Sequence, residues 1–141
     1  MKRTATANWK GSAREGAGTL DTQSGALAAQ PYTFKSRFVD ESGRSGTNPE
    51  ELIAAAHAGC FAMQFANFLA ENGTPAESLK VTAAVEVIPG TGITGSALTV
   101  EAKAPGLSQA KFAELADKAK SGCPVSKALG AINITMTAHL N

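Results

Sequence analysis

The chain contains few of the residues that build metal and nucleic-acid sites. Aromatic residues make up 6% of its 141 residues and charged residues 18%, and there are only two cysteines and two histidines. So few histidines and cysteines offer no ligand set for a metal ion. The 13 basic and 12 acidic residues are interspersed and form no basic stripe along which phosphates could bind, so nucleic-acid binding is not expected.

Long apolar runs are also missing. No segment stays apolar for the roughly 18 residues that a membrane-spanning helix requires, so none is expected. Residues 1–9 carry charge that no apolar stretch follows, so a secretory signal is not expected either. The cytoplasm is then the expected location, where cysteines stay reduced and structural disulfides are rare.

The apolar content that is present predicts one globular domain over residues 1–141. Hydrophobic residues make up 43% of the chain, which is enough for a sizeable core at this length. Alanine supplies much of that fraction. Because a core poor in large side chains buries little apolar surface, a second subunit is expected to complete it, and we predict a homodimer.

The N-terminal third predicts a β-meander. Alternating residues separated by glycine-rich turns indicate strands at 6–10 and 18–22. One or two further strands are expected around Leu27 and over 32–39, which places Arg37 in a strand.

Residues 47–72 carry the strongest local signal in the sequence. Asn48 is a good N-cap, Pro49 suits the first helical position, and Glu51 has the spacing of a capping box. The helix is expected to run to about Asn72, where Gly73 ends it. Because its residues are apolar on nearly every side, we predict a buried central helix.

The second half of the chain predicts a β-hairpin, two shorter helices and a final strand. Apolar residues alternate from 79 to 87 and again at 98 and 100, around the turn at 89–92. Ser108 is the expected cap of a helix that Gly122 ends, Pro124 begins a short helix, and residues 132–140 alternate as a strand. Because strands and helices are segregated along the chain, the fold class is α+β.

The two cysteines are the residues best suited to chemistry. Cys60 lies about three turns into the long helix, and Cys123 directly precedes Pro124 at an expected N-cap. Their separation fits neither a zinc site nor a CxxC redox motif. A single buried cysteine is most often an inert small hydrophobe, but two of them on separate helices, each beside polar residues, are harder to dismiss.

Reactivity requires a thiolate, and a free cysteine with a pKa of about 8.5 is only a few per cent ionised at neutral pH. Lowering that pKa by about 3 requires about 4 kcal/mol. An arginine at about 4 Å supplies a similar amount at an effective dielectric constant of about 20. Arg14, Arg37 and Arg44 are the candidates, and Glu50 could orient one of them by a bidentate pair.

Local electrostatics leave open which cysteine attacks. Cys123 has a helix N-terminus, where thiol pKa values are usually lowered, whereas Cys60 lies in mid-helix. His57 lies one turn before Cys60 and could pair with it, but a partly buried, hydrogen-bonded histidine is the favoured interpretation.

The sequence resembles the OsmC/Ohr family of osmotically inducible and organic hydroperoxide resistance proteins, and is most similar to its OsmC branch. The resemblance covers nearly the whole chain. It is carried by residues 19–38, GTNPEEL at 46–52, AAHAGCF at 55–61 and AKSGCPVS at 119–126.

The resemblance implies an intertwined homodimer with two active sites at its interface. It implies that Cys60 is the attacking cysteine and Cys123 the resolving one, with Glu50 and Arg37 as their charged partners. The hydroperoxide-resistance branch takes its arginine from the region of Arg14, so that residue is the alternative. No metal, flavin or haem is needed for this chemistry.

The function implied is reduction of organic hydroperoxides, and more weakly of hydrogen peroxide, in oxidative or osmotic stress defence. Cys60 would form a sulfenic acid, Cys123 would close an intrachain disulfide, and a dithiol reductant, for example of lipoyl type, would restore both thiols. An apolar lining from Leu52, Phe61, Met63 and Phe65 would favour organic peroxides. The alternatives are a general thiol-disulfide oxidoreductase and a non-catalytic binding protein for hydrophobic small molecules.

Overall fold

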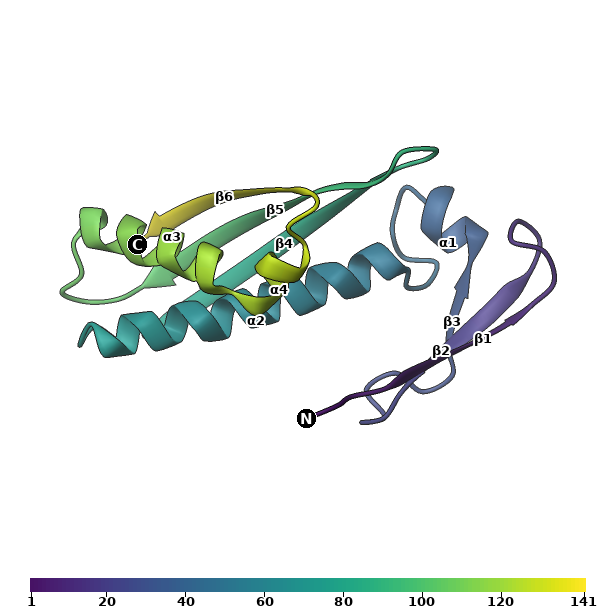
Figure 1. The fold of residues 1–141 in the computed structure, drawn as a ribbon, viewed down its shortest axis with the longest axis horizontal. Helices are drawn as coiled ribbons and strands as arrows, with labels where there is room; N and C mark the ends of the chain where they lie inside the picture. Colours follow the sequence, from purple (N-terminus) through teal and green to yellow (C-terminus); the bar gives the residue numbers. More distant parts are fainter. The chain divides into compact units, whose positions relative to one another are not determined.

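The first three strands form an antiparallel sheet in the order β1-β2-β3. The computed structural model describes all residues, 1–141, and places β1 at Ala5–Lys10, β2 at Ala17–Thr22 and β3 at Gln30–Thr33 (Figure 1). Gly18 pairs with Trp9 on one side and with Tyr32 on the other. The ring centroids of Trp9 and Tyr32 are 5.1 Å apart. A Cβ at Gly18 would lie 2.6 Å from the Trp9 ring and 2.8 Å from the Tyr32 ring, so only glycine lets these rings meet. The predicted meander is confirmed.

A short helix, α1 (Phe34–Phe38), follows β3 where the sequence predicted a strand. The Thr33 hydroxyl accepts from the Ser36 N–H at 3.1 Å, and the Ser36 hydroxyl accepts from the Thr33 N–H at 3.0 Å. This capping box satisfies backbone groups that a strand would have had to pair elsewhere. The prediction of a strand through residue 39 was therefore wrong, and Arg37 lies on a helix.

The long helix α2 spans Pro49–Glu71, as predicted. The Asn48 side chain caps it by accepting from the Glu51 N–H at 2.8 Å. The chain leaves the helix at Gly73, whose φ of 78° suits glycine.

The prediction that α2 is buried all round was wrong for the single chain. Phe61, Phe65 and Leu69 are fully buried along one face. The opposite face is apolar but exposed and carries small residues together with Met63, which is 78% exposed. Alanine and glycine give both faces the same composition, so the sequence could not tell them apart.

By length and composition, α2 could cross a membrane, because an 18-residue window of it has a mean hydropathy of 1.4. The mean hydropathy of this window is that of a membrane-spanning helix, although His57, Gln64 and Asn67 interrupt its apolar run. Core helices of globular proteins meet the same criterion, and α2 contributes Phe61, Phe65 and the polar His57 to a protein core.

The C-terminal part of the chain forms a second three-stranded sheet in the order β4-β5-β6 (Figure 1). Strands β4 (Ser78–Ile88) and β5 (Gly92–Lys103) form the predicted antiparallel hairpin. Helices α3 (Gln109–Gly122) and α4 (Pro124–Ala128) then connect β5 to β6 (Asn133–Leu140), which runs parallel to β5. One βαβ connection thus occurs within the α+β fold, since parallel neighbours need a crossover.

The core of this part packs α2 and α3 against the inward face of β5. Phe65 of α2 meets Phe112 of α3 with ring centroids 5.4 Å apart. Leu98 and Val100 supply the strand's inward side chains, and Cys123 belongs to the same buried cluster. By their contacts the residues form two compact units, Met1–Leu52 and Ile53–Asn141.

Candidate active site

Hydrogen bonds tie α1 to the beginning of α2 within the first unit. The Ser36 hydroxyl donates to the Thr47 carbonyl at 3.1 Å, and the Asn48 amide donates to the Ser36 carbonyl at 3.3 Å. Arg37 follows Ser36, and Glu50 is the second residue of α2. The two caps therefore place Arg37 against Glu50.

Arg37 and Glu50 form a bidentate ion pair. The Arg37 Nη2 donates to Glu50 Oε1 at 2.7 Å, and the Nε lies 3.2 Å from both carboxylate oxygens. The Glu50 side chain is 7% exposed and that of Arg37 36%. A buried carboxylate needs such a partner, because an unpaired charge there would be strongly destabilising. The pairing of these two predicted site residues is thus built into one chain.

The other two arginine candidates lie differently. Arg14 is exposed and its guanidinium stacks on the Phe34 ring, 5.5 Å from the centroid. Arg44 is fixed through its backbone N–H, which donates to the Asp40 carboxylate at 2.9 Å. Neither forms an ion pair with Glu50.

An apolar cavity of about 470 Å³ lies beside the Arg37 guanidinium, all within the first unit. The residues around it are mostly aromatic or small: Trp9, Gly11, Ala13, Tyr32, Thr33, Phe34, Phe38 and Pro49. Such a cavity suits an organic group next to a single polar group.

Cys60 and Cys123 lie together in the second unit, both as free thiols. Cys60 is partly buried on α2, whereas Cys123 is fully buried at the junction of α3 and α4. The two thiols are close enough for each to shift the pKa of the other. The structure therefore brings together the two cysteines that the sequence singled out.

The surroundings of the two sulfurs shift their pKa values in opposite directions. Burial raises the pKa of the Cys60 thiol and outweighs the Val125 N–H, while the neighbouring Cys123 raises it further. Burial also raises the pKa of Cys123, but the Ser126 N–H, the Cys60 thiol and the Ser126 hydroxyl together lower it below its ordinary value. In the single chain, Cys123 is the more acidic thiol.

His57 lies in the core rather than beside a thiol. It is fully buried, and its Nδ1 and Nε2 lie 2.8 Å from the hydroxyls of Ser96 and Ser126 respectively. Burial lowers the pKa of His57, because the charged imidazolium loses its hydration. The favoured interpretation of His57 as a hydrogen-bonded histidine is confirmed, and its burial is complete rather than partial.

The predicted apolar lining near Cys60 is corrected in part. Phe61 and Phe65 are buried in the core against α3, whereas Met63 is exposed on the opposite face of α2. Successive helical residues diverge by about 100°, so these three side chains cannot line one site in a single chain.

Sequence reasoning missed Ser96 and Ser126, both buried. Ser96 occupies an inward position of β5, in phase with Leu98 and Val100. A polar residue in an inward phase of a strand signals a buried partner. For Ser126 the only signal was its place three residues after Cys123, in the first turn of α4.

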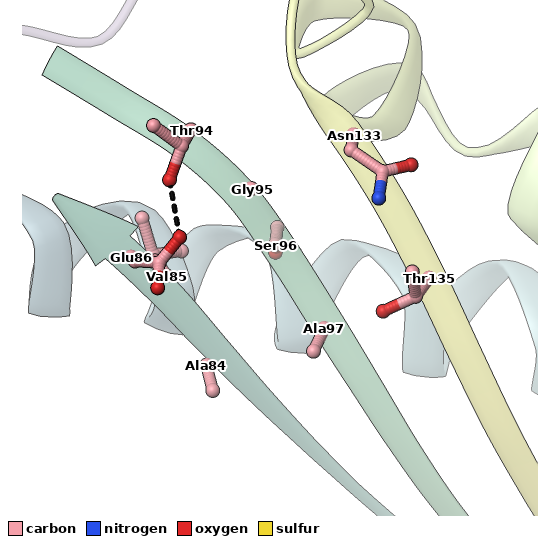
Figure 2. Close-up of a pocket in the computed structure, with 9 residues that line it drawn as sticks. All are labelled: Ala84, Val85, Glu86, Thr94, Gly95, Ser96, Ala97, Asn133 and Thr135. Atoms are coloured by element: carbon pink, nitrogen blue, oxygen red, sulfur yellow. Dashed lines mark hydrogen bonds between the residues drawn. The ribbon is translucent and has the colours of Figure 1, made fainter. Parts of the chain in front are cut away.

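The outward face of the second sheet carries a shallow hollow of about 390 Å³ (Figure 2). Figure 2 shows Thr94 and Glu86 bonded to each other across β5 and β4, with Asn133 and Thr135 on β6. This hollow contains no cysteine, and none of the predicted site residues borders it.

The two free thiols and the Arg37–Glu50 pair are the chemically reactive or charged features around which the candidate active site is built. Residues 41–138 match the family described as OsmC-like protein, and the chain belongs to this family.

The sequence is 46% identical over 137 residues to Peroxiredoxin OsmC of Escherichia coli (strain K12), with 95% of this chain and 93% of that protein covered. It is 36% identical to the organic hydroperoxide resistance protein of Xanthomonas axonopodis pv. citri (strain 306), with 72% of each chain covered. Among solved structures, an organic hydroperoxide resistance protein OsmC of Legionella pneumophila superposes with a TM-score of 0.68 at 25% identity, over 96% of each chain.

Proposed function

We propose that the protein is a thiol-dependent peroxidase that reduces organic hydroperoxides. The observation that carries this proposal is the proximity of two free thiols, the partly buried Cys60 and the buried Cys123, each of which shifts the pKa of the other. Relatives named as a peroxiredoxin and as a hydroperoxide resistance protein support it.

The proposed reaction has three steps. The Cys60 thiolate attacks the terminal peroxide oxygen, the O–O bond breaks, and the alcohol leaves after taking one proton, so that Cys60 becomes a sulfenic acid. The Cys123 thiolate attacks the Cys60 sulfur, which forms the disulfide and releases hydroxide that is protonated to water. A dithiol then reduces the disulfide by two exchange steps and becomes oxidised itself.

Arg37 is proposed to lower the pKa of Cys60, and Glu50 to hold the guanidinium in place. Glu50 and Cys60 lie ten residues apart on α2, a rise of about 15 Å along a regular helix. We therefore propose that the Arg37–Glu50 pair acts on Cys60 of a second copy of the chain.

The homodimer that this requires is supported by the exposed apolar face of α2. Within the second unit this face carries Ala55, Ala56, Gly59, Met63 and Ala66, all exposed. Contiguous exposed apolar surface on a long helix is typical of an interface. Sedimentation should give the mass of two chains, and Met63→Glu should shift it toward one.

The preference for an organic peroxide follows from the apolar cavity beside Arg37. An alkyl or aryl group would lose water on entering it, whereas hydrogen peroxide has no such group. We place the enzyme in the cytoplasm, in defence against oxidative or osmotic stress, with a dithiol such as a lipoyl group as reductant.

The test is consumption of cumene hydroperoxide by the reduced protein with excess dithiothreitol. We expect multiple turnovers, faster than with hydrogen peroxide, and none with Cys60→Ser. Reduction of insulin disulfides without peroxide consumption would instead identify a general thiol-disulfide oxidoreductase. If the wild-type protein consumed no peroxide, and both it and Cys60→Ser bound cumyl alcohol, the protein would instead be a binding protein for hydrophobic small molecules.

A further inference from the structure

A buried chain of hydrogen bonds runs from β5 through α2 to α4. His57 is fully buried, and Ser96 and Ser126 are 1% and 7% exposed. Each ring nitrogen lies 2.8 Å from one serine hydroxyl. Figure 2 shows Ser96 on the middle strand β5, with helix α2 behind the sheet. All three residues belong to the second unit, and the proposed reaction assigns a role to none of them.

The protons of this chain can be counted. A neutral imidazole has one N–H donor and one acceptor nitrogen, and each serine hydroxyl has one proton. In one arrangement the Ser96 hydroxyl donates to Nδ1, and the Nε2–H donates to the Ser126 oxygen. In the other, the Nδ1–H donates to Ser96, and the Ser126 hydroxyl donates to Nε2. The two arrangements differ in where the Ser126 proton lies.

Ser126 connects this choice to a thiol. It follows Cys123 by three residues, in the first turn of α4. The Cys123 side chain makes no capping hydrogen bond there. Cys123 is nevertheless the N-cap and Ser126 the third residue of the helix, and the side chains at these two positions are neighbours. The N–H and the hydroxyl of Ser126 both act to lower the pKa of Cys123. Only the arrangement with a proton on His57 Nε2 leaves the Ser126 hydroxyl free to donate to that sulfur.

We propose that His57 is a positioning residue for the resolving thiol, and that its Nε2–H tautomer directs the Ser126 hydroxyl proton toward the Cys123 thiolate. When Cys123 is a neutral thiol, its S–H can donate to Ser126, and the opposite tautomer becomes allowed. Ionisation of Cys123 therefore selects the Nε2–H tautomer. The value of this to the enzyme rests on the proposed function, in which the Cys123 thiolate attacks the Cys60 sulfenic acid.

Few other charges surround this chain. Cys60 of α2 is the titratable group that faces Cys123. Asp117 and Lys120 of α3 and Lys127 of α4 border a hollow of about 280 Å³ that Ser126 also lines. Strand β6 contributes only the uncharged Ile134 to that hollow.

The test follows the imidazole ¹⁵N shifts of His57 during a pH titration of Cys60→Ser, in which Cys123 is the only thiol. Thiolate absorbance near 240 nm gives the ionisation of Cys123 in the same samples. We expect His57 to become Nε2–H with the same pH midpoint as that absorbance. His139, the other histidine, is exposed at its own site on β6 and serves as the internal control.

Ser126→Ala provides the second measurement. Loss of a hydrogen bond to a charged group should lower the thiolate fraction of Cys123 about tenfold at a fixed pH. The matched control is Ser121→Ala, because Ser121 lines the same hollow but donates to the Asp117 carbonyl. A His57 tautomer that stays constant while Cys123 ionises, or equal midpoints in the two alanine variants, would overturn the proposal.

Neither measurement uses a peroxide, so the outcome is separable from the proposed function. A protein that consumes no peroxide could still show the coupled titration. A working peroxidase could equally lack it, if His57 only holds α2, β5 and α4 together. In that case His57 would keep one tautomer throughout.

Discussion

The Arg37–Glu50 pair and the Cys60–Cys123 pair contrast in almost every physical respect. The first is an ion pair between a partly exposed arginine and a buried glutamate, held by polar caps. The second is a pair of thiols, of which Cys123 lies in the apolar core and Cys60 packs against it. Burial raises the pKa of Cys60, which opposes the activation that a nucleophilic thiol needs. The lesson is that the Arg37–Glu50 pair forms within the first unit and the two thiols lie within the second, so each pair is explained by its own local contacts.

The largest expected effect comes from removing the sulfur of Cys60, which is proposed to attack the peroxide. Cys60→Ser should abolish peroxide consumption, because a hydroxyl at this position does not ionise near neutral pH. Cys123→Ser should still reduce one equivalent of peroxide, since the first step needs only Cys60. A stopped-flow assay that counts equivalents separates the two. Equal loss in both variants would contradict the division of roles.

Breaking the ion pair should have the next largest effect. Arg37→Met should slow the reaction of Cys60 with peroxide at neutral pH by about a hundredfold, because Glu50 already offsets part of the full charge effect. The pH at which the rate is half-maximal should rise as well.

Arg14→Met is the matched control for Arg37→Met. Arg37 stacks on the Phe38 ring and Arg14 on the Phe34 ring, but Arg14 pairs with no carboxylate. It should leave the rate within about twofold. If instead Arg14→Met were the slow variant, the arginine of the hydroperoxide-resistance branch would be the activating one. Arg37→Lys should recover only part of the rate, because lysine lacks the bidentate fork.

A moderate effect is expected on acid stability in the thiol-bearing unit. The folded pKa of His57 lies below its ordinary value of 6.5, so the unfolded chain takes up this proton first as pH falls. Stability is therefore full above about pH 6.5 and falls below it, by at most about 1.4 kcal/mol per pH unit. His57→Phe should remove this slope in urea unfolding, whereas His139→Phe should not. An unchanged slope in His57→Phe would show that another group causes it.

The smallest effect is expected in the loop that leads from α1 to α2. Hydrogen bonds from the Ser42 hydroxyl and from Ser45 hold the pKa of Asp40 well below its usual range. A lowered pKa stabilises the loop at pH values above about 4, and this contribution disappears as the carboxylate is protonated. Asp40→Asn should lower Tm slightly at pH 7 and by less at pH 2, where this contribution is partly lost. If Tm decreased equally at both pH values, the charge of Asp40 would not be the cause of the loop's stabilisation.

The sequence predicted most of the fold because its signals were local. The capping pattern at Asn48 and the glycine at 73 defined α2, and alternation defined β4, β5 and β6. It failed at residues 34–39, where Phe34, Phe38 and Val39 are residue types typical of strands, while the Thr33–Ser36 capping box begins a helix. It could not give the parallel direction of β6, which depends on how the α3–α4 crossover packs.

The candidate site was predicted in part for a similar reason. Cys60, Cys123, Arg37 and Glu50 were candidates from their residue types, and the resemblance assigned their roles. The structure forms the two pairs separately. The buried contacts of His57 with Ser96 and Ser126 join residues 39 and 69 positions apart. No local pattern reveals such contacts.

The central claim is that Cys60 is the sulfur that attacks, although Cys123 is the more acidic thiol in the single chain. It is tested by treating Cys60→Ser and Cys123→Ser, each reduced, with one equivalent of cumene hydroperoxide and a sulfenic-acid trap, followed by peptide mass spectrometry. We predict a trapped adduct on Cys60 in Cys123→Ser and none on Cys123 in Cys60→Ser. An adduct on Cys123, with Cys60 unmodified in the matching variant, would reverse the roles and contradict the account.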